Sequence, residues 1–155
     1  MKILQYLFIS LSHKILKILP YRLIRLLSVP IGTLYFLLTF RSSIKLFKRR
    51  KIFEKLKINY KPLIVKINYT RYWLETLWLT NKNFSKHITP HVEIENQEYV
   101  DKLKKQYPGL IFALPHLGNW EFAIPIGNSI KLNLLAVAEP LSNSYVLNWF
   151  KTLRE

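Results

Sequence analysis

The stretch Leu110–Glu121, LIFALPHLGNWE, decides the fold that this chain is expected to adopt. It opens with a continuous apolar run, LIFAL, which is typical of a short strand buried on both faces of a parallel sheet. Proline, histidine and glycine follow where such a strand would end. Functional groups gather at the carboxyl ends of strands in α/β sheets, so the sequence puts a candidate site at His116.

Elements of the same kind are predicted further along the chain. Leu132–Ala138, LNLLAVA, predicts a second buried strand. A helix is expected between the strands from Trp120 to Asn128, and Pro125 should kink or shorten it. Another helix, capped by Ser142 or Asn143, should run to the chain end. Strand, helix, strand, helix in this order predicts an α/β unit with a right-handed crossover.

Three further elements are predicted before this unit. Residues 91–95, HVEIE, alternate in polarity like a short strand. Residues 97–106 predict a polar helix that ends before the Pro108–Gly109 turn. Residues 63–79 predict a helix rich in aromatic side chains.

Composition and charge limit the class of protein. The chain has 155 residues, no cysteine and a formal net charge of +15. This length suits one domain, and the missing cysteine excludes disulfides, thiolate catalysis and Cys-ligated zinc. Residues 1–66 carry fifteen basic side chains and one acid (+14), whereas residues 67–155 carry nine basic and eight acidic ones (+1). The first part therefore predicts an anionic partner, either nucleic acid or anionic lipid.

The apolar pattern of the basic part favours lipid. One helical stripe about 160° wide, which is typical of a helix lying in a membrane interface, holds Ile3, Leu4, Leu7, Phe8, Leu11, Ile15, Ile18 and Leu19. Pro20 ends this pattern. A nucleic-acid-binding arm would have little use for so wide an apolar face.

A second apolar segment follows, and a dense basic run follows that. Leu26–Phe40 carries no charge, but it is shorter than the about 20 residues of a membrane span, and Pro30 and Gly32 interrupt it. We expect a re-entrant or interfacial hairpin there, with a buried core helix as the alternative. Residues 45–57, KLFKRRKIFEKLK, predict a patch that binds lipid headgroups.

The candidate chemistry depends on His116 and Glu121. Five residues correspond to about 140° around an ideal helix, so a turn containing Gly118 would have to fold Glu121 back towards the imidazole. A carboxylate there would fix the histidine tautomer and raise the basicity of the other ring nitrogen. The pair would then be a general base for an alcohol, worth about 10²–10⁴ in rate. On spacing alone, a structural histidine bonded to a carbonyl is the better interpretation.

The whole string PHLGNWE after LIFAL is more specific. It resembles the late lipid A acyltransferases, the lauroyl and myristoyl transferases, and the related phosphatidylinositol mannoside acyltransferases. In that family HxGNWE or HxGNWD holds the His-x4-acid motif of lysophospholipid-type acyltransferases. Tyr72–Glu75, Ala138–Leu141 and Trp149–Arg154 resemble neighbouring family segments, and the resemblance covers about residues 20–155.

The resemblance implies an enzyme of the His-x4-Asp/Glu acyltransferase type. It would move a fatty acyl group from acyl-carrier protein or acyl-CoA to a hydroxyl of a glycolipid, of lipid A or phosphoinositol-mannoside type, or of a lysophospholipid. His116 and Glu121 would be catalytic, with His116 as the base. Asn119, Glu139 and Arg154 would bind substrate, Arg154 through a phosphate. No cofactor is implied beyond the acyl donor. Two structural alternatives carry equal weight: an ordinary salt bridge between Glu139 and Arg154, and ordinary core packing of Trp120.

The resemblance also sets the expected organisation and location. Residues 1–60 would be a membrane-anchoring helical region. Residues 61–155 would be the N-terminal part of a glycerol-phosphate-acyltransferase-like α/β domain, whose C-terminal part is missing because family members are normally longer. The protein would lie peripherally, as a monotopic protein, on the cytoplasmic (inner) membrane with its active site on the cytoplasmic side. Its partners would be anionic membrane lipids, the acyl donor, a glycolipid acceptor and a C-terminal partner fragment, but no nucleic acid.

The sequence offers two other interpretations. His87 and His91 stand four apart, but Pro90 between them breaks the helix that would align them and no third ligand stands out, so no metal site is expected. A non-enzymatic basic protein that binds membrane or nucleic acid is the alternative to an acyltransferase.

Overall fold

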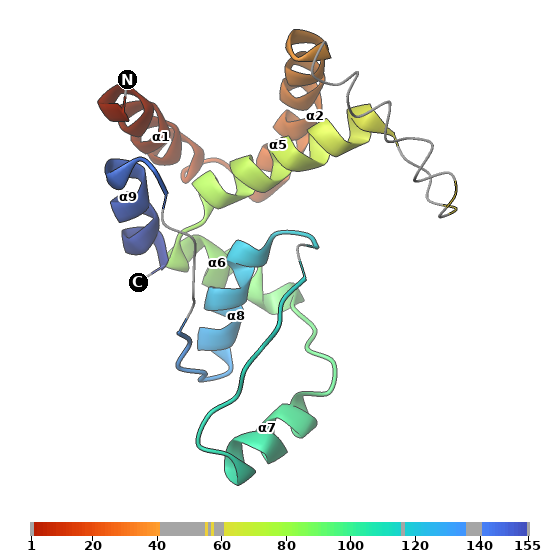
Figure 1. Ribbon diagram of the computed structural model, residues 1–155, viewed down its shortest axis with the longest axis vertical. Helices are drawn as coiled ribbons and strands as arrows, with labels where there is room; N and C mark the ends of the chain where they lie inside the picture. Colours follow the sequence, from red (N-terminus) through yellow and green to blue (C-terminus); the bar gives the residue numbers. More distant parts are fainter. Residues whose placement is uncertain are drawn as a thin grey trace. The chain divides into compact units, whose positions relative to one another are not determined.

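A computed structural model describes residues 2–40, 55, 57, 61–115, 117–135 and 141–154 (Figure 1). The chain divides into two compact units, the first made of residues 1–79 and 140–155 and the second of residues 80–139. The first unit contains α1 (Lys2–Leu16), α2 (Tyr21–Leu38), α5 (Pro62–Trp78) and α9 (Ser144–Arg154). The second unit contains α6 (Asn81–His87), η1 (Thr89–His91), α7 (Gln97–Gln106), η2 (Trp120–Phe122) and α8 (Ala123–Ser129).

The prediction of an α/β fold is wrong, because no strand is present among the residues that the structure describes. Residues 110–114 are extended but unpaired, and residues 92–95 also form no strand. Ile111 is fully exposed and Leu135 is 95% exposed, so neither predicted strand is buried. A strand requires a neighbour for its backbone hydrogen bonds, and an apolar run alone supplies none. Residues 136–138 of the second predicted strand lie outside the described residues.

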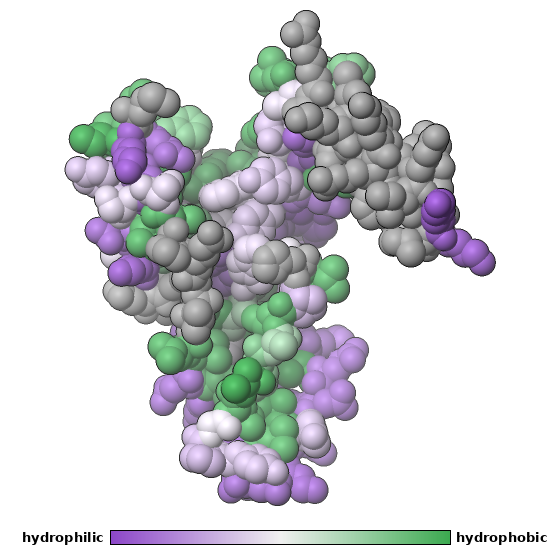
Figure 2. Space-filling view, viewed as in Figure 1, coloured by the Kyte–Doolittle hydropathy of each residue, from purple (hydrophilic) through white to green (hydrophobic). Residues whose placement is uncertain are grey.

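These segments leave apolar side chains at the surface of the second unit, where Figure 2 shows hydrophobic residues on the face in view. Both ends of the predicted strand–helix–strand stretch contribute. The large exposed hydrophobic side chains there are Ile111, Phe112, Leu114, Leu117, Leu134 and Leu135.

The apolar segment that was expected to form a hairpin is part of the continuous helix α2, so the hairpin prediction is wrong. Pro30 lies inside this helix, where proline costs one backbone hydrogen bond and a steric clash. Hydroxyl groups bond to carbonyls on both sides of it: Ser28 Oγ donates to Arg25 O at 2.6 Å, and Thr33 Oγ1 donates to Val29 O at 2.8 Å. The helix continues through Pro30 and packs along α5.

Gly32 explains how α2 and α5 pack. A Cβ atom at Gly32 would lie 2.6 Å from Ile67 Cα on α5, which is closer than side chains allow. Glycine therefore permits the two helix backbones to approach, as small residues do at tight helix crossings. Ser28 and Ile24, one and two turns before Gly32, are also fully buried. The glycine that suggested a break is instead a packing position.

Polar bonds join the start of α2 to the end of α5. The Trp78 indole donates to Leu19 O at 2.9 Å, and the Tyr21 hydroxyl donates to Glu75 Oε1 at 3.0 Å. Trp78 is 1% exposed and Glu75 is 7% exposed. Burial first, and then the neighbouring Glu75 carboxylate, raise the pKa of Tyr21 to about 12. The tyrosine is therefore a neutral donor at physiological pH.

Asn143 precedes α9 and caps it, as predicted, and it also joins α9 to α1. Its Oδ1 accepts from Tyr145 N at 3.1 Å, and its Nδ2 donates to Lys2 O and to Gln5 Oε1, each at 3.0 Å. Lys2 Nζ also donates to Ser142 O at 3.0 Å. Two segments at opposite ends of the sequence thus build one unit.

Helix predictions elsewhere were more accurate than the strand predictions. The predicted helix over residues 97–106 is confirmed as α7, and the predicted helix over residues 63–79 corresponds to α5. Of the helices that the structure describes, α2 is the one whose length and composition would allow it to cross a membrane. The basic run at residues 45–57 lies outside the described residues, apart from Lys55 and Lys57.

Candidate functional site

The candidate site lies around a turn at Gly118 in the second unit. Gly118 has φ 64°, in the left-handed region, and a Cβ there would meet no atom within 4 Å. The backbone conformation, rather than the available space, therefore favours glycine. Asn119 follows and caps η2, because its Oδ1 accepts a hydrogen bond from Glu121 N at 3.1 Å. The chain bends at Gly118, but His116, towards which the predicted turn would fold Glu121, lies outside the described residues.

Glu121 presents a buried carboxylate. Its side chain is 4% exposed, although burial of a carboxylate is costly unless partners compensate for the lost water. One partner is Trp120, whose indole Nε1 donates to Glu121 Oε1 at 3.0 Å. Hydrogen bonds to a charged acceptor contribute about 1.5–3 kcal/mol. The carboxylate is therefore held in one orientation rather than left to rotate.

Aromatic packing fixes the short helix that carries Glu121. The ring of Phe122 meets the ring of Phe84 on α6 edge to face, with centroids 5.4 Å apart. Phe84 is 1% exposed, so this contact belongs to the core of the second unit. Such aromatic pairs add about 0.5–1.5 kcal/mol beyond their buried area. The contact limits how far Glu121 can move.

Sequence reasoning did not predict the hydrogen bond from Trp120 to Glu121, since it gave the indole no role other than packing in the core. A usable signal existed in the pair Trp120–Glu121. An indole carries one obligatory N–H donor, and the adjacent residue is an acid that must find donors when buried. The structure shows this donor and this acceptor bonded to each other.

The predicted site residues have different outcomes. Asn119 and Glu121 are brought together at the start of η2. His116 and Glu139 lie outside the described residues. Arg154 is the last residue of α9 in the first unit, and its side chain is likewise outside the description. The roles of all five residues stay predictions.

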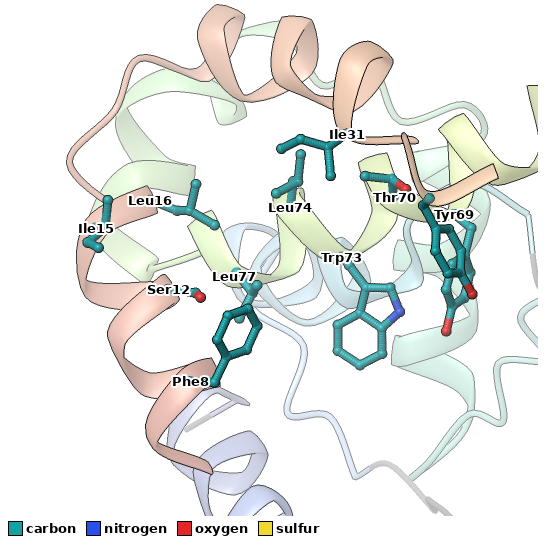
Figure 3. A pocket seen from close by; sticks show the side chains of 11 residues that line it. Phe8, Ser12, Ile15, Leu16, Ile31, Tyr69, Thr70, Trp73, Leu74 and Leu77 are labelled. Carbon is teal, nitrogen blue, oxygen red and sulfur yellow. The ribbon is translucent and has the colours of Figure 1, made fainter. Parts of the chain in front are cut away.

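The first unit holds an open groove of about 620 Å³ between α1, α2 and α5 (Figure 3). Ile15 and Leu16 lie at one end of it, and Tyr69 lies at the other. Volumes of this size are typical of sites for small organic ligands. Sequence reasoning did not find this groove, because it forms only when three separate helices pack together. Its lining consists of Phe8, Ser12, Ile15, Leu16, Ile31, Tyr35, Tyr69, Thr70, Trp73, Leu74 and Leu77.

Comparison with known proteins identifies the family. Residues 1–155, the whole chain, match the model of the family described as bacterial lipid A biosynthesis acyltransferase. The chain belongs to this family. Comparison with the curated proteins and with the solved structures gives no match.

Membership of the lipid A acyltransferase family assigns the protein to the acyltransferases of lipid biosynthesis. It favours the enzymatic interpretation over a non-enzymatic basic binding protein. Within the described ranges, no group of three His, Cys, Asp or Glu side chains is placed to hold a metal ion. The chemistry that the described site offers is that of a fixed, buried carboxylate at a sharp turn, suited to orienting or charge-balancing a neighbouring base.

Proposed function

We propose that this chain transfers a fatty acyl group from acyl-carrier protein or acyl-CoA to a hydroxyl of a glycolipid of the lipid A type, with His116 as the general base. The observation that supports this most is the Glu121 carboxylate, which is buried and bonded to Trp120 within the HLGNWE string of a chain that matches the family throughout. Glu121 stands five residues after His116, and the Gly118 turn lies between them.

In the proposed reaction the His116 imidazole takes the proton of the acceptor hydroxyl while the hydroxyl oxygen attacks the thioester carbonyl carbon. A carbon–oxygen ester bond forms and the carbon–sulfur bond breaks. The proton then passes from His116 to the leaving sulfur, so that the free thiol of the donor is released. Glu121 orients the imidazole and stabilises its cationic form. A thioester is already activated, so the reaction requires no cofactor beyond this donor.

The remaining predicted residues have proposed roles in binding. Arg154 binds a phosphate of the donor or of the acceptor, since a guanidinium group matches the geometry of phosphate oxygens. Glu139 and Asn119 hold the acceptor. The partners in this proposal are the acyl donor, the glycolipid and the anionic lipids around it.

We place the protein on the cytoplasmic face of the inner membrane, as a peripheral, monotopic protein. The apolar stripe of α1 is exposed, and so are several apolar residues of α2. The α5 helix packs along α2 and carries Lys66, Arg71 and Glu75, which would be costly in hydrocarbon. This favours α2 lying at the interface over α2 crossing the bilayer. The large exposed apolar residues of the two helices are Ile3, Leu4, Leu7, Phe8, Leu11, Ile15, Leu23, Leu26, Val29, Ile31, Leu34, Leu37 and Leu38.

The proposed function is tested with the full chain in bacterial membranes, by following transfer of a labelled acyl group to glycolipid. Acyl-carrier protein and CoA thioesters are supplied in parallel. His116→Ala should lower the rate by about 10²–10⁴. Glu121→Gln should lower it less, because it keeps the size of the side chain and removes only the charge.

Matched controls come from the same unit. His91→Ala and Glu98→Gln change exposed residues of the same types outside the motif, and both should leave the rate unchanged. An unchanged rate in His116→Ala would refute the assignment of the base. Equal losses in His91→Ala would show that the effect comes from folding rather than chemistry.

A further inference from the structure

The lining of the groove in the first unit changes from apolar to polar along its length. Its body is apolar, with Leu16, Ile31 and Leu74 among its lining residues. At the Tyr69 end the character changes: the rings of Tyr35 and Tyr69 stack with centroids 6.3 Å apart, and Tyr69 is half exposed. An apolar channel that ends in phenol groups resembles the profile of a lipid, with a tail and then a wet interface.

A positively charged side chain, that of Lys66, lies at the same end of the groove. Lys66 Nζ lies 4.2 Å from the centroid of the Tyr35 ring. Lys66 precedes Thr70 by one helical turn on α5, and Thr70, Trp73 and Leu77 continue along the groove on the same helix face. Among the described residues, none of those that line the groove is acidic. The charge at this rim therefore suits an anionic group attached to an apolar chain.

We infer that this groove binds one acyl chain of an anionic phospholipid from the surrounding membrane, with the headgroup phosphate at Lys66. The inference rests on the membrane association proposed above and adds a binding site to it. The bound lipid is a docking ligand that fixes α1 against α2 and α5. It is separate from the acyl group that the enzyme transfers.

Two features favour a membrane lipid as the occupant. Phe8 and Ile15 line the groove from α1 and are 71% and 51% exposed, so the apolar face of α1 and the groove are continuous. A chain lying in the bilayer surface can therefore enter from the side without crossing water. The basic charge of residues 1–66 attracts anionic headgroups to this part of the chain.

Photo-crosslinking tests this inference with the purified full chain and vesicles of phosphatidylglycerol and phosphatidylcholine. The phosphatidylglycerol carries a photoreactive diazirine near the end of one acyl chain, and mass spectrometry locates the adducts. We expect adducts to concentrate on Trp73 and Leu74 in the groove, in preference to Leu4 and Leu11 on the exposed face of α1.

A groove-filling variant sharpens the test. Ser12 lines the groove, so Ser12→Phe should lower groove adducts about tenfold while vesicle binding persists. Ser10→Phe is the matched control, because Ser10 lies on the same helix outside the groove lining. Adducts spread evenly over α1 and α2, or unaffected by Ser12→Phe, would overturn the inference.

A charge variant tests the headgroup contact. Lys66→Gln should reduce the preference of groove adducts for phosphatidylglycerol over an equally labelled phosphatidylcholine by about fivefold. Lys61→Gln, an exposed lysine at the start of the same helix, should leave that preference unchanged. Equal effects of both variants would show general attraction to the surface and would overturn the assignment of Lys66.

The other outcomes separate this inference from the proposed function. If the chain binds vesicles but the groove stays unlabelled, only the lipid site fails. If the chain stays in the supernatant when the vesicles are sedimented, the proposed membrane association fails and the lipid site fails with it. If the groove is unlabelled and Ser12→Phe converts a dimer to a monomer, the occupant is a second copy of the chain. Acyl transfer is measured separately through His116→Ala.

Discussion

Replacing Gly32 with alanine should separate α2 from α5. The new methyl group would lie 2.6 Å from Ile67 Cα and 3.1 Å from Ile67 Cγ1, whereas carbon atoms in contact prefer about 3.5–4.0 Å. The Ile67 backbone cannot rotate away, so the helices must move apart by about 1 Å. Overpacking of this kind costs about 1–3 kcal/mol. Alanine recovers about 1 kcal/mol of helix propensity relative to glycine. Because the clash is with a backbone atom, the upper part of that cost applies, about 2–3 kcal/mol, and the free energy of unfolding should fall by about 1–2 kcal/mol.

The assay is thermal or urea unfolding of the purified chain in mild detergent, followed by circular dichroism. Two other glycines give matched controls. A Cβ at Gly109 meets nothing within 4 Å, so Gly109→Ala should have no packing cost. A Cβ at Gly127 meets the end of the Leu134 side chain, which can rotate away, so Gly127→Ala should cost less than Gly32→Ala. A Gly32→Ala variant as stable as the wild type would refute the close crossing of α2 and α5.

Three further perturbations test other contacts. Trp120→Phe keeps an aromatic ring and removes the hydrogen-bond donor to Glu121. In the transfer assay kcat should fall about tenfold, KM should stay unchanged, and the pH–rate profile should be displaced. A shift in KM alone would contradict a positioning role. Tyr21→Phe tests the pKa of Tyr21, which is raised to about 12. The hydrogen bond from Tyr21 to Glu75 stabilises the fold fully below pH 10 and is lost as the pH rises through 12. The wild type should therefore lose more stability than the variant across that interval. Asn143→Ala removes the cap of α9 and its bonds to α1 and should cost about 0.5–2 kcal/mol in urea unfolding; an unchanged midpoint would show that the cap contributes nothing.

The helices could be predicted from the sequence because their signals are local. The polar helix over residues 97–106 and the cap at Asn143 each depend on a few neighbouring residues, and both are present. Strands depend on partners elsewhere in the chain. The run LIFAL has the composition of a buried strand, yet the exposure of Ile111 shows that composition cannot supply the neighbour.

The breaks expected in α2 failed for a related reason. The helix propensities of Pro30 and Gly32 are low, and on this local ground alone a break was expected at both residues. The contact between Gly32 and Ile67 joins residues from two different helices, and only the packed structure reveals it. Tertiary packing overrode propensity at this position.

The candidate site was predicted in part. The turn at Gly118 followed from the need to bring Glu121 back along the chain, and the left-handed backbone agrees with it. The bond from Trp120 was missed because the indole was treated as apolar volume. The groove of the first unit could not be predicted, since its walls come from three helices whose relative placement no local pattern contains.

The first unit is built from two segments that lie far apart in the sequence, and this has a consequence for biosynthesis. Asn143 bonds to Lys2, 141 positions earlier in the sequence. At translation rates of about 5–20 residues per second, α1 leaves the ribosome roughly 7–30 s before the residues that cap it. Throughout that interval the side of the nascent α1 that carries Tyr6 and His13 lacks its native neighbour α9, whose Tyr145 and Trp149 rings contact these two side chains in the folded chain.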